Sequence, residues 1–255
     1  MTFSRTGRLS IVVGLTVLLV GCGGDDGAEE AATTTTTTPA TTTVGVDCPN
    51  PEGGSINTCL GDLDAGAHET TTLAPTLAYL VPDGWSNQED LPGNFLLLPP
   101  GSTLEGVNPE TSDFLGVYSS VGAPLGCAEQ ADPAVASTPQ AMVDWLGTQA
   151  AIEVSAPTPV TIGGLSGLQV DLAFDDARAE AGCTDDLGSY ALAIVGTGRS
   201  SLAHGVSPGY ALRLAFLTNG DAVMAVELAD APDGGSDYED FWGTAADVVD
   251  SFRFA

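Results

Sequence analysis

Few residues of this 255-residue chain have the types and spacing needed for nucleophilic chemistry. The segment GLSGL at 164–168 comes close to the G-x-S-x-G turn of serine hydrolases, but it lacks the last glycine. Ser166 also begins an alternating apolar segment, so a glycine-rich turn into a strand explains the motif sufficiently. The two histidines, His68 and His204, lie in polar segments, and we interpret them as solvated loop residues rather than general bases. We therefore expect no catalytic residue.

Two other motifs point only weakly to a ligand. The segment GTGRS at 196–200 has the glycines and arginine of an anion-binding loop, but it lacks a further glycine and a following helix. The segment DLDAG at 62–66 has the start of a calcium loop without the later oxygen ligands. The acidic turn DGGSD at 233–237 is better explained as a helix cap. We expect no metal and no cofactor, with weak calcium binding as the alternative.

The N-terminal residues form an export signal. Arg5 and Arg8 precede the apolar run at 11–20, which as a helix spans only about half of a bilayer core. The run ends in Leu-Val-Gly-Cys at 19–22, which resembles the lipobox of bacterial lipoproteins. This resemblance implies cleavage before Cys22 and a lipid on its sulfur, whereas an ordinary secretory peptide is the alternative. We expect the protein at the outer face of the cell membrane.

Four segments follow from these features. Residues 1–21 are the signal peptide, and residues 22–46 are the lipidated cysteine and a flexible stalk rich in Thr, for which O-glycosylation is a hypothesis. Residues 47–74 form a lead-in segment stapled by a disulfide. Residues 75–255 form the folded domain.

With Cys22 assigned to lipid, four cysteines remain, which is an even set for an oxidising compartment. Three connectivities are open, and we favour Cys48–Cys59 and Cys127–Cys183. A metal site is the weaker alternative, because the chain has no C-x-x-C and two histidines.

The charge balance restricts the partners. Against 34 acidic residues the chain has six basic ones, all arginine, and the formal net charge is −28. Because phosphate binding needs clustered cations, we expect no nucleic-acid partner and no docking on anionic lipid headgroups. The repulsion between copies favours a soluble monomer.

The elements that must position any site are mostly strands. Apolar or alternating runs predict strands at 75–81, 94–98, 114–121, 159–162, 165–174, 190–195, 210–217 and 222–228. Asn219-Gly220 predicts a type I′ hairpin between the last two. Thr138-Pro139 predicts the start of a helix that ends near Gly147. A second helix begins at Ser236 or Asp237, and its apolar stripe is Phe241, Ala245, Val248, Val249 and Phe252.

These elements predict an α+β domain, an antiparallel sheet with a central helix and a C-terminal helix packed on it. The segment YLVPDGW at 79–85, the final hairpin at 212–228 and the last helix running into SFRF at 251–254 resemble the Mog1/PsbP-like fold. Together with the lipobox and the stalk, they are similar to actinomycete envelope lipoproteins of the LpqN type. The resemblance implies a fold whose members are mostly binding or assembly factors.

We therefore expect a lipid-anchored extracytoplasmic protein, not an enzyme, that binds an envelope component, a partner protein or a small ligand. The alternatives are an inert structural element of the envelope and, less favoured, a secreted hydrolase. A binding module requires a concave apolar site with polar groups at its rim. Trp85, Tyr118, Tyr190 and Tyr210 are aromatic residues that could line it.

Overall fold

The structure is a computed structural model that describes residues 61–101, 112–186, 188–231 and 238–255. The chain divides into two compact units, residues 1–43 and 44–255. All described residues belong to the second unit.

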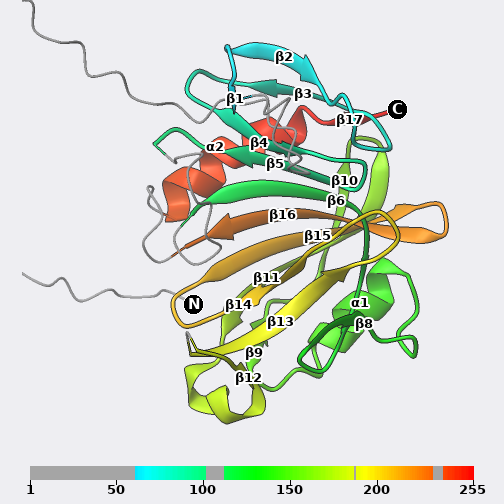
Figure 1. The fold of residues 1–255 in the computed structure, drawn as a ribbon, viewed down its shortest axis with the longest axis vertical. Helices are drawn as coiled ribbons and strands as arrows, with labels where there is room; N and C mark the ends of the chain where they lie inside the picture. The colour runs from blue at the N-terminus through cyan, green and yellow to red at the C-terminus, as the bar shows by residue number, and fades with distance from the viewer. Residues whose placement is uncertain (1–60, 102–111, 187, 232–237) are drawn as a thin grey trace, which may run out of the picture. The chain divides into compact units, whose positions relative to one another are not determined.

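Antiparallel strands dominate the described residues (Figure 1). Twelve described strands make one sheet. They are β1 (Gly61–Asp62), β4 (Ser86–Asp90), β5 (Asn94–Leu98), β6 (Phe114–Gly122), β9 (Ile152–Val154), β10 (Thr158–Ile162), β11 (Leu165–Phe174), β12 (Cys183–Thr184), β13 (Ser189–Gly196), β14 (Ala203–Val206), β15 (Ala211–Asn219) and β16 (Ala222–Asp230). Its main path runs β1-β4-β5-β6-β16-β15-β11-β10, while β13 pairs with β6, β12 and β14, and β9 pairs with β11.

Two smaller sheets complete the strands of the described chain. One has the order β17-β3-β2, formed by Arg253–Phe254, Leu77–Val81 and Gly66–Glu69. The other is the hairpin of β7 (Pro124–Leu125) and β8 (Ala128–Ala131). Because β2 pairs with β3 and β1 pairs with β4, the described part of the lead-in segment is continuous with the sheets that follow it.

The predicted strands lie where the apolar runs placed them. β5 and β11 have the predicted bounds, and the other six differ from prediction by one or two residues at either end. The structure confirms the predicted fold class at the level of a strand-rich, mostly antiparallel sheet with few helices among the described residues. Eight described strands of four or fewer residues had no sequence prediction within their range, and they are β1, β2, β7, β8, β9, β12, β14 and β17. Such strands are too short to show a period.

The hairpin between β15 and β16 turns one residue later than predicted. Asn219 pairs with Ala222, so the two central residues are Gly220 and Asp221 rather than Asn219 and Gly220. Gly220 has φ +60°, a left-handed conformation that glycine adopts without a Cβ clash. The hairpin therefore turns where Gly220 occupies the first central position of the two-residue loop, which requires a positive φ.

Two α-helices are described, and each contributes to a different core. Helix α1 (Pro139–Leu146) begins as predicted, with the Thr138 side chain accepting a hydrogen bond from the Ala141 N–H. Helix α2 (Tyr238–Asp250) carries four residues of the predicted apolar stripe, and the fifth, Phe252, follows the helix; all five are buried. Its predicted caps, Ser236 and Asp237, lie outside the described residues. A 3₁₀ helix at Asp176–Ala181 occupies the acidic segment between β11 and β12.

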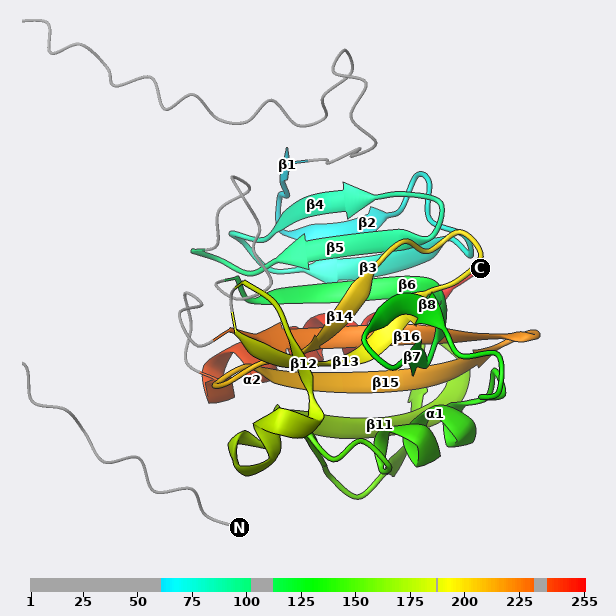
Figure 2. The same cartoon turned by 60° about the horizontal axis from the view of Figure 1, so that its bottom comes forward.

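The sheet separates two hydrophobic cores because side chains alternate along its strands. On β15, Leu212, Leu214 and Phe216 join the core beneath α1, whereas Ala215 and Leu217 join the core beneath α2 and β3. Figure 2 shows β13 and β14 crossing one face of the sheet while α2 lies on the other. Any site in this domain must therefore be formed on one face or the other.

Candidate functional site

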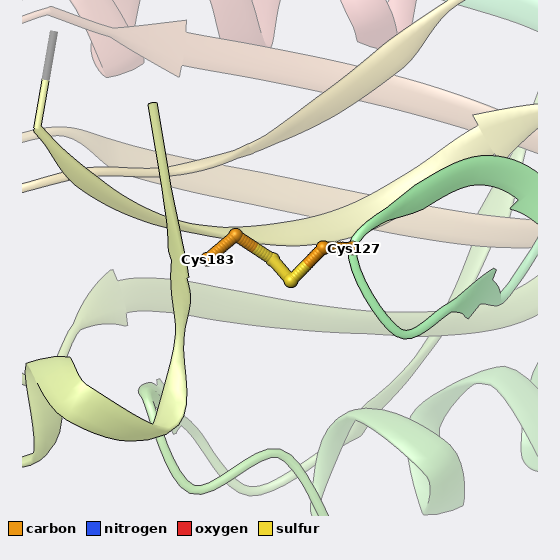
Figure 3. Close-up of a disulfide and its surroundings, with 2 residues drawn as sticks. All are labelled: Cys127 and Cys183. Carbon is orange, nitrogen blue, oxygen red and sulfur yellow. A yellow bond between two sulfur atoms is a disulfide. The ribbon is translucent and has the colours of Figure 1, made fainter. Parts of the chain in front are cut away.

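Of the five cysteines, the described residues include Cys127 and Cys183, and these two form a disulfide, as predicted. Their Cα atoms are 5.6 Å apart, and the bond joins the β7–β8 turn to the start of β12 (Figure 3). Cys22, Cys48 and Cys59 lie outside the described residues, so the lipid anchor and the second disulfide stay predictions. The one disulfide described therefore ties the β7–β8 turn to β12 across 56 residues of sequence.

The hydrolase motif is divided among separate elements. Ser166 is exposed near the start of β11, where it pairs with Thr161 of β10. His68 lies on β2, where its Nε2 bonds to the Asp64 carbonyl at 2.8 Å and its ring stacks on Tyr79. The other histidine, His204, bonds to Glu227. Each histidine thus has a partner other than Ser166.

A pocket of about 200 Å³ lies between the C-terminal half of α2 and strands β10, β11, β15 and β16. Its lining combines an apolar surface with polar side chains, as a small-ligand site requires. The apolar residues are Val160, Ile162, Ala215, Val226, Leu228, Ala246 and Val249. The polar residues are Thr161, Gln169, Arg213 and Asp250. The four aromatic residues that the sequence suggested are absent from this lining.

Arg213 is held in place at this pocket by two contacts. Its Nε and Nη2 donate to the two carboxylate oxygens of Asp171 on the neighbouring strand, at 2.7 and 3.1 Å. Its guanidinium carbon lies 3.9 Å from the ring centroid of Trp242 on α2. A two-bond pair and a stacked aromatic ring fix a planar guanidinium well. Arg213 therefore offers a pre-positioned polar group beside an apolar surface.

A second cluster lies in the opposite core and centres on Glu227 of β16, which is fully buried. His204 Nδ1 lies 2.7 Å from Glu227 Oε2 and 3.3 Å from the Tyr118 hydroxyl. The rings of Phe114 and Tyr118 meet the imidazole edge-on. Glu227 Oε1 has no hydrogen-bond partner among the described residues. The arrangement is a carboxylate–imidazole pair inside a hydrophobic core.

The electrostatics of the cluster favour a charged imidazole. Burial lowers the pKa of His204, but the charge and hydrogen bond of Glu227 and the charge of Glu89 outweigh it, so the pKa is raised. Burial and the charge of Glu227 raise the pKa values of Tyr118 and Tyr210 well above normal, so both hydroxyls keep their protons. Burial likewise raises the pKa of Glu89.

The interpretation of His204 as a solvated loop residue is wrong. His204 lies on β14, and its side chain keeps 19% exposure. The segment at 201–209 looked polar because its apolar residues are few, yet pairing with β13 turns it into a strand. A sequence signal did exist at the partner: Glu227 occupies a core position of the apolar strand at 222–228, since Ala225 and Ala229 two residues away are both buried. A buried carboxylate needs a partner.

Within the described residues, no group of three or more His, Cys, Asp or Glu side chains is arranged to hold a metal ion. Of the calcium-loop residues, Asp62 lies on β1 and the Asp64 carbonyl is bonded to His68. The predicted turn at 233–237 lies outside the residues that the structure describes. No described helix is both long enough and apolar enough to cross a membrane.

No family model and no curated protein matches the chain. Two solved structures are similar to it at a TM-score of 0.33. One is a crystal structure from Bacteroides thetaiotaomicron VPI-5482, 13% identical, covering 76% of this chain. The chain spans about half of that protein, 49% of its length. The other is the solution structure of cyanobacterial PsbP (CyanoP) from Synechocystis sp. PCC 6803, 10% identical, covering 75% of this chain and 94% of that one.

The chain is thus a strand-rich protein with a mostly antiparallel sheet and few described helices.

Proposed function

We propose that this chain is a lipid-anchored envelope protein of the LpqN type, with a Mog1/PsbP-like domain that binds a small ligand and performs no catalysis. The lipobox at 19–22 and the Thr-rich stalk support the anchor at Cys22 on the outer face of the membrane. The observation that carries the binding role is the pocket beside α2, because it joins an apolar surface to a fixed arginine. The disulfide between Cys127 and Cys183 suits an oxidising compartment.

The pocket sets the size and character of the ligand. A cavity of about 150 Å³ lined by apolar side chains accommodates benzene, so a pocket of about 200 Å³ suits a group of similar size. Thr161, Gln169 and Arg213 at its border can bond to one polar end of such a ligand. The ligand is therefore small and largely apolar, with a single polar end.

The charges around the pocket narrow the class of ligand further. Asp171 already neutralises Arg213, and Asp250 adds a carboxylate to the lining. The formal net charge of the whole chain is −28. Because this field repels anions, an uncharged or cationic ligand suits the pocket better than a phosphate or a polyanion.

Native mass spectrometry of the full chain, purified from the envelope in which it functions, tests the proposal. We expect a mature chain that begins at a lipid-bearing Cys22 and carries an additional, dissociable small-molecule mass. Ala246→Leu fills the pocket from an exposed helix position and should abolish the additional mass. Thr244→Leu, also exposed on α2 but outside the pocket lining, is the matched control and should retain it.

The two parts of the proposal can fail separately. An unlipidated chain would refute the anchor, and a lipidated chain without bound ligand would refute the binding role. The second result would favour the alternative of a structural or assembly element of the envelope. Ligand retained in Ala246→Leu would show that binding occurs away from this pocket.

A further inference from the structure

The buried carboxylate of Glu227 is an unusual feature for the centre of a sheet. Glu227 is opposite Gly116 of β6 in the register, and both of its neighbours on the same face of β16 are alanines of the core. A Cβ on Gly116 would lie within 2.7 Å of the Tyr118 ring carbon that carries the hydroxyl. The missing side chain of Gly116 therefore lets the Tyr118 hydroxyl lie over β6 beside Glu227.

His204 supplies the positive charge that this carboxylate needs. Its Nδ1–H donates to Glu227 Oε2 at 2.7 Å, while Glu227 Oε1 has no hydrogen-bond partner among the described residues. A buried carboxylate is costly unless it is paired and hydrogen-bonded. The Tyr118 hydroxyl adds a hydrogen bond to Glu227, but the positive charge that offsets the burial of this carboxylate comes from one imidazole.

Every other ionisable group acting on the cluster is acidic or neutral. Glu89 of β4 acts on His204, and Tyr118 of β6 and Tyr210 before β15 are protonated hydroxyls. Asp113 before β6 and Asp230 at the end of β16 act on Tyr210. Among these groups, His204 is the one that can become a cation.

Strand β14, which carries His204, has few other attachments. It has four residues, of which only Val206 is fully buried, and within the described chain it pairs with β13 alone. That pairing contains a register shift between Leu192 and Ile194. A short edge strand with so little buried apolar surface opens at low cost.

The segment before β14 is held more firmly. The Ser200 hydroxyl donates to the Gly93 carbonyl at 2.7 Å, and the Asn94 side chain bonds to both the N–H and the carbonyl of Ser201. These bonds fix the loop at 197–201 to the start of β5. Movement of β14 would therefore begin after Ser201, which limits it to the part of the segment that contains His204.

We propose that the His204–Glu227 pair is a pH-sensitive latch: protonated His204 holds β14 against the sheet, and loss of that proton lets β14 open. Neutral His204 can still donate a hydrogen bond, but it no longer balances the charge of the buried carboxylate. Contact with water then stabilises the Glu227 carboxylate, and the opening of β14 provides this contact. The latch lies in the core opposite the ligand pocket and is independent of the proposed binding role.

The direction of the pH effect follows from the raised pKa of His204. A histidine whose pKa is higher in the folded state stabilises that state fully below its unfolded value, about 6.5. The stabilisation is lost as the pH rises through the folded value, which lies above 6.5. The latch is therefore closed in mild acid and opens from neutral pH upward.

Hydrogen exchange of the full chain between pH 5.5 and 9 tests the latch. Protection factors, which remove the intrinsic pH dependence of exchange, should fall at least tenfold for the β14 amides as His204 titrates. The amides of the β15–β16 hairpin should keep theirs. Because the chain has two histidines, ring NMR follows His204 directly once His68→Gln has assigned the signals.

Two variants separate the latch from a structural role. His204→Gln keeps a hydrogen-bonding side chain without a titrating charge, so its β14 protection should be low and independent of pH. His68→Gln is the matched control and should keep the wild-type profile, since His68 lies on β2 and bonds to the Asp64 carbonyl. Constant protection of β14 across the His204 titration in the wild-type chain would overturn the proposal, whether or not the variants fold.

Discussion

Opening the Cys127–Cys183 disulfide should destabilise the folded domain by an amount that its loop length sets. The variant Cys127→Ser is the simplest perturbation, because Cys127 is exposed while Cys183 is buried and keeps its packing. A double variant, Cys127→Ser with Cys183→Ala, removes the free thiol as well. Substitution is preferable to reduction, since a reducing agent would also open the predicted disulfide between Cys48 and Cys59.

The magnitude follows from the 56 residues that separate the two cysteines. On the chain-entropy account, closing a loop of this length in the unfolded state stabilises the folded protein by about 4 kcal/mol. For a domain of this size, that loss lowers Tm by about 8–16 °C. It is also a large part of the about 5–15 kcal/mol by which domains are stable.

Urea unfolding followed by tryptophan fluorescence measures the loss, because Trp85 and Trp242 are both buried. We expect the free energy of unfolding to fall in both variants, and the two losses to agree within about 1 kcal/mol. A loss below about 1 kcal/mol in both would refute the reasoning. It would mean that the unfolded chain gains little freedom when the loop opens, or that the loop of the native protein is already held by other contacts.

Two other predictions concern single buried contacts: the close approach of Gly116 to Tyr118 and the hydrogen bonds of Asp90. Gly116→Ala should cost about 1–3 kcal/mol by overpacking, because its Cβ would meet the Tyr118 ring. Gly243→Ala, on a part of α2 where a Cβ meets nothing within 4 Å, should instead stabilise the domain by about 1 kcal/mol; equal effects in thermal unfolding would contradict the contact. Asp90→Ala should cost about 3–5 kcal/mol, because the buried carboxylate accepts bonds from the N–H groups of Thr71, Thr72 and Leu73 and from the Thr71 hydroxyl. Asp83→Ala, at an exposed turn, should stay within about 0.5 kcal/mol of wild type, and a similar loss in both would argue against these bonds.

The eight strands with an apolar or alternating run and the two α-helices could be predicted because each pattern depends on neighbours within a few residues. The run at 165–174 alternates, and the C-terminal stripe from Phe241 to Phe252 repeats at helical spacing, so a burial pattern could be inferred from each. The lipobox at 19–22 and the even set of four cysteines are local or compositional too. These features allowed the strand-rich class, the Cys127–Cys183 pair and the proposed anchor to be inferred before any contact was known.

The sites depend on contacts that no local pattern records. His204 and Glu227 are 23 residues apart, and the pair forms because β14 crosses the sheet face on which the Glu227 side chain lies. Arg213 gains its role from Asp171 on a paired strand and Trp242 on a helix. Composition and periodicity report which side chains are buried, whereas the chemistry of a buried group depends on which other group the fold places beside it. The tertiary structure alone decided that partner for His204, Glu227 and Arg213.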